Sequence, residues 1–480
     1  MAEKRDKPPG ARVISLTEAK QSPARRRPEP VKAASGEWMT DLGNARQLVR
    51  RHGADFRYVP LWDKWLAWRD GHWWRDIDGA IVRAAKATAE EMLREAFLLE
   101  DPDARGKAMK HALDTQKASR LKGMIMLAES ELPVILPVER IDCDPLLLGV
   151  ANGVIDLRNQ SFREARKEDY ITKRAGVAHD PKARCPAWEA FLARIHSAPG
   201  MVDYIQRCFG YVLTGQTGEE VAFILWGGGA NGKSTLRETL FALMGDYAVA
   251  SDAALLTAVR QAGQASAATP EVARLLGMRL VTINETSDGD VLNESRVKFI
   301  TSHDKLNARG LYQDPFDFTP THKTMLTTQH KPIIKGTDEG IWRRLQLWAF
   351  LHQFPEGERD INFRERVLIP EMAGILNWAL KGLRSYQQCG LNPPEAVRAA
   401  TSEYRKDMDL VGQWIGERCI LDPGAQALSR DLHLNYKQWS EDEIGFSLSP
   451  KRFSQTLIER GFRPVYFQRG RGFRGLRLLF

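Results

Sequence analysis

A glycine-rich segment, GGGANGKST at residues 227–235, has the residue types and spacing that bind a polyphosphate. It fills the pattern GxxxxGK[ST], in which glycines let backbone N–H groups curl around a phosphate. Lys233 would reach the β- and γ-phosphates, and the Ser234 hydroxyl would bind Mg²⁺. The segment therefore predicts a site for ATP and Mg²⁺ formed by Gly227, Gly228, Gly229, Ala230, Asn231, Gly232, Lys233, Ser234 and Thr235.

The flanks of this segment support the same interpretation. An apolar strand pattern, VAFILW at 221–226, precedes it, and a helical pattern, LRETLFALMG at 236–245, follows it. The start of a helix adds partial positive charge beside a phosphate. A chance glycine-rich turn would not bring this strand–loop–helix order with it.

A second strand pattern, RLVTIN at 279–284, ends directly before a carboxylate. An ATPase of this kind needs an acidic residue at the end of a neighbouring strand to hold Mg²⁺ and orient water. Glu285 would serve both purposes, with Asn284 as a polar helper in place of the usual second acid. The alternative is a surface glutamate that follows a strand.

Two further features could complete such a site. KTMLTTQHKP at 323–332 is a strand pattern that ends in Gln329, whose amide could orient the attacking water. DEGIWRRL at 338–345 places Arg343 beside Arg344, and an arginine supplied across a subunit boundary could neutralise transition-state charge. Taken alone, these features would be a strand-end turn and a solvated face.

The elements that carry these residues alternate along the chain. Residues 186–350 alternate helical stretches with short apolar strands, which predicts a mostly parallel sheet with helices on its faces. Residues 56–76 contain five tryptophans and an Asp-Gly turn at 70–71, typical of a hairpin with a following strand. We favour a small aromatic core there over a surface that stacks bases. Residues 78–130 are predicted to be helical, and NGVIDL at 152–157 to be a strand.

Composition and charge set the wider limits. The 480 residues are 43% hydrophobic and 27% charged, which excludes wholesale disorder, and no apolar run is long enough to span a membrane. The five cysteines are widely spaced, which argues against a zinc site and fits a reducing cytoplasm. Residues 1–35 hold nine Lys/Arg against four Asp/Glu, and residues 451–480 hold eight against one. Two basic ends on a chain of net charge +8 favour a nucleic-acid partner over solvated tails.

The order of the motifs resembles that of superfamily 3 helicases, in the phage and plasmid primase-helicase branch related to the poxvirus helicase-primase. The resemblance is most specific over 220–350 and extends over residues 40–480. Residues 152–180 resemble the helical domain that precedes the motor in that branch. The segments that carry the resemblance are GGGANGKST, GMRLVTINET, KFITSHDKLNARGLYQDPFDFTPTHK, LTTQHKP and DEGIWRRLQLWAF.

The resemblance implies an AAA+-type core that assembles as a ring, usually a hexamer, around single-stranded DNA, with 3′ to 5′ unwinding. Gln329 would be the polar sensor, where the family usually has asparagine, and Arg343 or Arg344 would be the finger. The other arginine would pair with an acid such as Asp338 or Glu339. A hairpin within 303–323 would enter the channel, with DNA contacts from Lys305, Arg309 and Tyr312.

The last 75 or so residues resemble a winged-helix domain that binds duplex DNA. SLSPKRFSQTLIERG at 447–461 would be the recognition-type helix, with Ser449 as its N-cap before Pro450. The wing would be a strand pair at 464–480 that carries Arg469, Arg471 and Arg474, which suit phosphate contacts. The alternative is a basic hairpin that docks a protein.

These observations together predict an α/β fold in five parts. They are a disordered basic arm (1–35), an α-rich N-terminal domain with the small Trp-rich β element (36–185), the P-loop ATPase core (186–352), a helical connector (353–404) and the winged-helix domain (405–480). The expected function is an ATP-dependent DNA helicase that replicates a phage, plasmid or integrated element in a bacterial cytoplasm. No primase pattern is evident, so a separate primase is an expected partner. The alternatives are an origin-binding initiator in which ATP is an assembly switch, and an ATPase that remodels protein.

Overall fold

The computed structural model describes residues 39–257, 269–284, 289–310, 314–336, 339–444 and 447–479. The chain divides into two compact units. One contains the described residues up to Ala54 and Ile81–Val134, and the other contains Asp55–Ala80 and the described residues from Ile135 onward. The division runs through the segment 36–185, so the domain boundaries drawn from the sequence stay predictions. Within the described ranges, no helix has both the length and the apolar character needed to cross a lipid bilayer.

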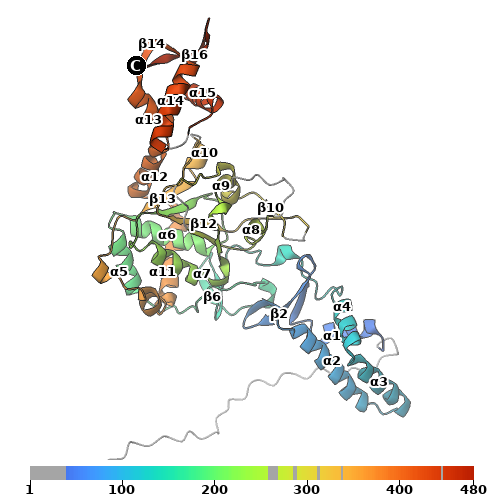
Figure 1. Ribbon diagram of the computed structural model, residues 1–480. Coiled ribbons are helices and arrows are strands. Elements are labelled where there is room, and N and C mark those ends of the chain that lie inside the picture. The colour runs from blue at the N-terminus through green and yellow to red at the C-terminus, as the bar shows by residue number, and fades with distance from the viewer. Residues whose placement is uncertain are drawn as a thin grey trace, which may run out of the picture. The chain divides into compact units, whose positions relative to one another are not determined.

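The first unit is helical, as the pattern at 78–130 predicts (Figure 1). Each of two helices begins at a side-chain cap, because the Thr40 hydroxyl accepts from Gly43 N–H and the Asp101 carboxylate accepts from Ala104 N–H. A buried amide, Asn44, donates to the Thr115 hydroxyl at 3.1 Å and so ties the first helix to the third. The helices are α1 (Asp41–His52), α2 (Ala80–Phe97), α3 (Pro102–Thr115) and α4 (Ala118–Ala128).

The tryptophan-rich segment forms a three-stranded antiparallel sheet of β1 (Phe56–Val59), β2 (Lys64–Arg69) and β3 (His72–Arg75). Asp70 and Gly71 both have positive φ in the turn between β2 and β3, as a tight hairpin requires. Trp65 and Trp73 are buried, whereas Trp74 is exposed. The predicted aromatic core is therefore present. A second small sheet contains β4 (Leu147–Val150), β5 (Gly153–Asp156) and β6 (Ser161–Arg163).

The predicted parallel sheet is confirmed. Its strands lie in the order β13-β7-β12-β9-β8, and every neighbouring pair is parallel. Three of these strands, β7, β9 and β12, are the apolar segments singled out in the sequence. β13 lies within the segment DEGIWRRLQLWAF, and the short edge strand β8 has no strong pattern of its own. The strands are β7 (Ala222–Trp226), β8 (Ala248–Ser251), β9 (Leu280–Asn284), β12 (Lys323–Thr328) and β13 (Leu345–Ala349).

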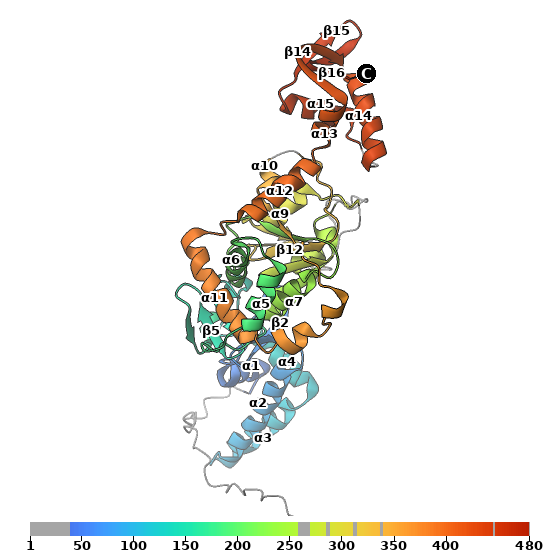
Figure 2. The same ribbon diagram turned by 90° about the vertical axis from the view of Figure 1, so that its left-hand side faces the viewer.

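Alternate side chains of each strand enter two different cores, because successive residues of a strand point to opposite faces. Phe223 and Leu225 pack with α5 (Pro186–Ile195), α6 (Met201–Leu213), α7 (Lys233–Met244) and α11 (Met372–Cys389). Ala222 and Ile224 pack on the other face with α8 (Pro270–Ala273), α9 (Glu294–Thr301) and α10 (Glu339–Trp342). Figure 2 shows α7 and α9 on opposite sides of β12. The result is a three-layer α/β/α arrangement.

The edge strand β13 is covered by α12 (Glu395–Asp407), whose Thr401 hydroxyl accepts from Leu347 N–H at 3.0 Å. A side chain that satisfies an edge N–H removes a place where another chain could pair. Outside the main sheet, β10 (Leu306–Ala308) and β11 (Phe316–Phe318) form an antiparallel hairpin. This hairpin falls within the stretch 303–323, where a channel hairpin is predicted.

The C-terminal part alternates helices with one antiparallel sheet of order β14-β16-β15. Ser449 caps its helix as predicted, because its hydroxyl accepts from Arg452 N–H and Pro450 is the first helical residue. The strand β14 is absent from the sequence prediction, which named only the helix at 447–461 and the strand pair at 464–480 in this part. The elements are α13 (Leu410–Arg418), β14 (Cys419–Leu428), α14 (Ser429–Ile444), α15 (Pro450–Glu459), β15 (Arg463–Phe467) and β16 (Gly470–Leu478).

Candidate active site

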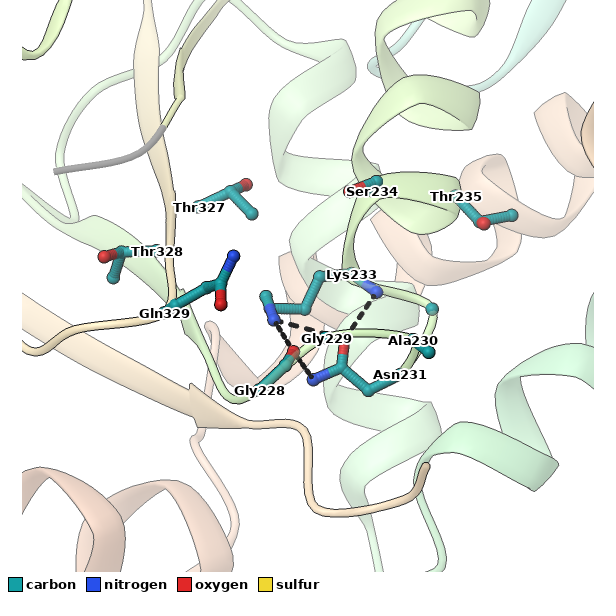
Figure 3. Close-up of a pocket in the computed structure, with 11 residues that line it drawn as sticks. Gly228, Gly229, Ala230, Asn231, Lys233, Ser234, Thr235, Thr327, Thr328 and Gln329 are labelled. Carbon is teal, nitrogen blue, oxygen red and sulfur yellow. Dashed lines mark hydrogen bonds between the residues drawn. The ribbon is translucent and has the colours of Figure 1, made fainter. Parts of the chain in front are cut away.

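A pocket of about 210 Å³ opens where β7 ends and α7 begins. One wall is the glycine-rich segment, and the facing wall is the end of β12 (Figure 3). Both lie at the carboxyl edge of the parallel sheet, where ligands of open α/β sheets bind. The lining residues are Gly228, Gly229, Ala230, Asn231, Gly232, Lys233, Ser234, Thr235, Thr327, Thr328 and Gln329. The structure therefore places nearly all of the predicted ATP-binding residues around one cavity.

The loop conformation requires glycine at two positions. Gly227 has φ of 151°, and a Cβ there would meet the Phe350 carbonyl oxygen at 2.5 Å. Gly232 has φ of 87°, and a Cβ there would lie 2.9 Å from Ile195 Cγ2. Gly232 is also the N-cap of α7, where no side chain caps the first turn. The N–H groups of this turn can therefore serve an anion.

Lys233 is buried, and its ammonium group contacts neutral oxygens of its own loop. Nζ donates to the carbonyls of Gly227 and Gly228, both at 2.6 Å, and to Asn231 Oδ1 at 3.2 Å. Asn231 Nδ2 donates in turn to Gly228 O and Phe350 O, which locks the loop against the end of β13. A positive charge held by neutral acceptors is well suited to exchange them for phosphate oxygens.

The facing wall contains a residue that the sequence analysis missed. Thr327 is buried and lines the pocket, and its hydroxyl has no hydrogen-bond partner among the described residues. The neighbouring Thr328 hydroxyl instead donates to His330 O at 2.7 Å. Figure 3 shows Thr327 and Gln329 across the pocket from Lys233. Thr327 lies two residues after buried Met325, so it is the last residue of β12 on that face of the sheet. This pattern could have identified it, but only once the limits of the strand are known.

The strand β9 brings its end to the same place. Asn284 is the register partner of Thr327, so β9 ends beside the pocket. Asn284 Oδ1 accepts a hydrogen bond from Arg237 on α7. Asn284 thus binds the Arg237 side chain, and its expected role as a polar helper stays a prediction. Glu285 follows Asn284 in the chain but lies outside the described residues, so its role as water activator and metal ligand stays a prediction.

The two adjacent arginines have different environments. Arg344 is buried and donates to Glu220 Oε2 at 2.6 Å and to Gly340 O at 2.9 Å. Arg343 is exposed, with 62% of its side chain accessible, and lies 3.4 Å from the same Glu220 oxygen. The expected pairing with Glu339 is wrong, because Glu220 holds Arg344 and Glu339 pairs with Arg405. The expected pairing with Asp338 stays a prediction. Asp338 lies outside the described residues.

The arginine pair lies at the opposite edge of the sheet from the pocket. The two strands are parallel, with Leu345 opposite Ala222 and Ala349 opposite Trp226. Arg344 therefore lies at the amino end of these strands, whereas the glycine-rich loop begins at their carboxyl end. Five residues of strand separate these edges by roughly 16 Å. Neither side chain is therefore placed to act on the pocket of its own chain.

The candidate DNA contacts of the hairpin lie at its two ends. Lys305 is exposed at the base, directly before β10, and Arg309 is exposed directly after it, toward the turn. The Arg309 main chain is fixed by Thr269, whose N–H donates to Arg309 O at 2.9 Å. Tyr312 lies outside the described residues.

The candidate arginines of the C-terminal part are all exposed. Arg469 is in the turn between β15 and β16, and Arg471 and Arg474 are on β16. Arg474 is directly opposite Arg463 on β15. Like charges directly opposite one another destabilise a sheet. Such a pair therefore favours a face that binds an anion.

Comparison with known proteins identifies the relatives of this chain. Residues 45–197 match the family model described as D5 N terminal like. A protein of Acanthamoeba polyphaga mimivirus named "Putative helicase" is 31% identical over 325 residues, 63% of this chain and 34% of its own length. A "Putative primase" of African swine fever virus is 26% identical over 356 residues, 67% of this chain and 36% of its own length. The chain is therefore similar to D5-like primase-helicases over part of its length.

The matches cover only part of each relative, which limits the conclusions about function that they support. This D5-like chain spans about a third of the length of the curated relatives it matches. Those relatives come from viruses of eukaryotes, so they do not support the expectation of a bacterial host. A solved structure of the NrS-1 C terminal region aligns with 91% of this chain and 99% of its own, with a TM-score of 0.48 and 10% identity. That likeness is too distant to carry a functional conclusion.

Proposed function

We propose that this D5-like protein is an ATP-dependent DNA helicase, a P-loop motor of the AAA+ type that acts in DNA replication. The observation that carries the proposal is the pocket in which Lys233 and the start of α7 face Thr327 and Gln329. Relatives named as helicases and primases support the replicative role. A P-loop ATPase that remodels protein has no such support.

The residues present fit ATP with Mg²⁺. The buried Thr327 hydroxyl has no partner in the part of the chain that the structure describes, and the side chain lines the pocket beside Gln329. A bound nucleotide would supply the phosphate oxygens that such donors need, and Ser234 and Glu285 would hold the metal. Lys233 would neutralise charge on the β- and γ-phosphates, Gln329 would orient the attacking water, and Glu285 would accept its proton.

The position of Arg343 and Arg344, far from the pocket of their own chain, supports a ring-shaped oligomer. A guanidinium at the far edge of the sheet can stabilise transition-state charge only in another subunit's pocket. Arg343 is the better candidate because its side chain is exposed, whereas Arg344 is held by Glu220 and Gly340. We therefore propose a homo-oligomer, a hexamer by the resemblance, in which Arg343 acts in trans.

Two surfaces would contact DNA. The β10–β11 hairpin, with Lys305 and Arg309, would contact a single strand in the ring channel. The C-terminal part has the element order helix, strand, two helices and two strands, which supports a winged-helix domain for duplex DNA. Its α15 would be the recognition-type helix, and β15–β16 the wing.

The test measures ATP turnover of the full chain with and without single-stranded DNA. We expect the wild-type rate to rise with DNA and the Lys233→Ala variant to hydrolyse no ATP under either condition. Lys381→Ala, an exposed lysine on α11, is the matched control and should behave as wild type. ATP binding without DNA-stimulated turnover would favour the origin-binding initiator instead. Turnover by Lys233→Ala at the wild-type rate would exclude the site.

A further inference from the structure

Glu220 lies at the meeting point of three elements that carry proposed functions. It lies two residues before β7, the strand that leads to the phosphate-binding loop. Its carboxylate contacts His303, Arg343 and Arg344. His303 lies at the base of the β10–β11 hairpin, two residues before Lys305. One side chain thus joins the loop strand, the hairpin and the arginine pair.

The two oxygens of this carboxylate divide their partners. Oε1 lies 2.8 Å from His303 Nδ1, and since a carboxylate only accepts, that ring nitrogen carries the hydrogen. Oε2 accepts from Arg344 at 2.6 Å and lies 3.4 Å from Arg343. The contact with the hairpin and the contacts with the arginines are therefore made by opposite sides of one rigid group.

The partners are held with unequal strength. Arg344 is buried and also bonded to Gly340 O, so it anchors the carboxylate. Arg343 has a longer contact and an exposed side chain. If the carboxylate turns about its anchor on Arg344, the geometry of the longer Arg343 contact changes most.

The backbone of Glu220 has a strained conformation. Its φ is 51°, a left-handed conformation that residues other than glycine rarely adopt. Its N–H donates to Thr217 O at 3.0 Å, which closes a turn directly before β7. Such strain persists only where the surrounding contacts require it, and it often marks a functional position. The carboxylate is only 17% accessible, so water screens its contacts weakly.

We propose that Glu220 is a positioning residue that couples DNA contact at the hairpin to the placement of Arg343. This inference rests on the proposed function. Movement of the hairpin on DNA displaces His303 and turns the carboxylate, which changes where Arg343 is presented to the neighbouring subunit. Lys305 and Arg309 would bind the DNA strand, and the movement of Glu220 would then change the position of Arg343.

The experiment compares the ratio of DNA-stimulated to basal ATPase rate in full-length variants. Glu220→Gln keeps the shape of the side chain and removes its charge. We expect the ratio to fall at least threefold, with less than a twofold change in the DNA concentration for half-maximal stimulation. A variant that only weakened DNA binding would instead shift that concentration.

His303→Ala keeps the test valid if Glu220→Gln folds poorly, because the His303 side chain is 66% exposed. It should lower the ratio, and the double variant should lower it no further than Glu220→Gln alone. Asp304 is 83% exposed and lies 4.0 Å from the other ring nitrogen of His303, and within the described residues it contacts neither arginine. Asp304→Asn therefore removes a negative charge beside the same histidine without touching the Glu220 contacts, and it should leave the ratio unchanged.

Three outcomes would overturn the inference. In the first, His303→Ala and a folded Glu220→Gln both keep the wild-type ratio. In the second, the two losses multiply in the double variant, which would show independent effects. In the third, Asp304→Asn lowers the ratio equally, which would show a general charge effect. A wild-type rate that DNA does not raise would instead overturn the proposed function itself, and the coupling with it.

Discussion

At the scale of single residues, the pocket combines a buried cation with a buried hydroxyl. Lys233 contacts carbonyl oxygens of its own loop, whereas no described residue hydrogen-bonds to the Thr327 hydroxyl. A buried polar atom left without a partner is costly, and such an atom in a pocket indicates a ligand that it serves. Thr327 therefore joins Gln329 as a candidate group for the γ-phosphate or the attacking water.

Thr327→Val should lower kcat for ATP about tenfold or more, because it removes one preorganised donor at almost constant volume. The matched control is Thr324→Val on the same strand. Thr324 is also buried with a hydroxyl that lacks a partner, but it does not line the pocket. Steady-state ATPase kinetics of both variants check the prediction. Equal rates for the two variants would remove Thr327 from the site.

A second prediction at this scale concerns acid sensitivity. Burial lowers the pKa of His196 to about 4, below its ordinary value of 6.5. Between these values the unfolded chain binds a proton that the folded chain does not. Each such histidine therefore lowers the free energy of unfolding by about 1.4 kcal/mol per pH unit as pH falls from about 6.5 to about 4. His322, with a pKa lowered to about 4 by burial, should add a similar slope.

His196→Phe should remove one of these contributions, since the ring packs edge-on against Phe350 and phenylalanine does not titrate. Denaturant unfolding at several pH values measures the slope. We expect it to be smaller than the wild-type slope by about 1.4 kcal/mol per pH unit. Parallel curves for variant and wild type would show that His196 is protonated in the folded chain.

At the scale of elements, α6 and α11 approach so closely that each presents a glycine to the other. A Cβ on Gly382 would meet Gln206 O at 1.9 Å, and one on Gly210 would meet Leu383 N at 2.2 Å. These atoms belong to the backbone and cannot rotate away. The pair forms much of the core beneath one face of the sheet. The contact therefore fixes the distance between the two helices.

Gly382→Ala should lower the free energy of unfolding by about 1–3 kcal/mol, because overpacking displaces one helix. At an exposed helix position, replacing glycine with alanine instead raises the free energy of unfolding by up to about 1 kcal/mol. Gly123 in α4 has no atom within 4 Å of an added Cβ, so Gly123→Ala is the control of opposite sign. Denaturant melts followed by tryptophan fluorescence measure both. A stabilised Gly382→Ala variant would show that the helices can separate at no cost.

The sheet of the C-terminal part gives the second prediction for an element. Each phosphate contact contributes roughly 0.9 to the slope of log affinity against log salt. Replacing Arg469, Arg471 and Arg474 with alanine should therefore reduce the slope for duplex DNA by up to about 2.7. Arg398→Ala on α12, an exposed residue paired with Glu395, should leave it unchanged. An unchanged slope for the triple variant would favour the basic protein-docking hairpin.

At the scale of the whole molecule, the arginine pair and the pocket occupy opposite edges of one sheet. We expect Arg343→Ala to bind ATP but hydrolyse it poorly, whereas Arg344→Ala should mainly reduce stability by leaving the half-buried Glu220 without its close partner. Mixing Arg343→Ala with Lys233→Ala, each inactive alone, should restore partial ATPase. One interface of a mixed ring can combine an intact loop with an intact arginine.

The readout is the ATPase rate as a function of the mixing ratio, with subunit exchange shown independently. Lys233→Ala mixed with Glu285→Gln is the control, because both changes affect the same pocket and no interface of that mixture is complete. No recovery in mixed rings that do exchange subunits would argue that Arg343 does not act in trans.

Local features of the sequence determined the parts of this protein that depend on near neighbours. The strand, loop and helix around Lys233 follow from a few adjacent glycines and two periodic flanks, and the Ser449 cap follows from the residues beside it. The three apolar strands β7, β9 and β12 were evident because both faces of a central parallel strand are buried. The motif order also sufficed to reveal the resemblance to helicase-primases.

Only the tertiary structure decided what depends on pairing between distant segments. β14 contains Pro423 and Gly424, which disfavour a strand, and it forms because β16 pairs with it across an irregular register. Arg343 and Arg344 are equivalent in the sequence, and Glu220, more than 120 residues earlier in the chain, makes one an anchor and leaves the other exposed. Thr327 differs from Thr328 only by the face of β12 that it occupies. Burial and charge pairing are set by which segments meet, and that is a property of the folded chain.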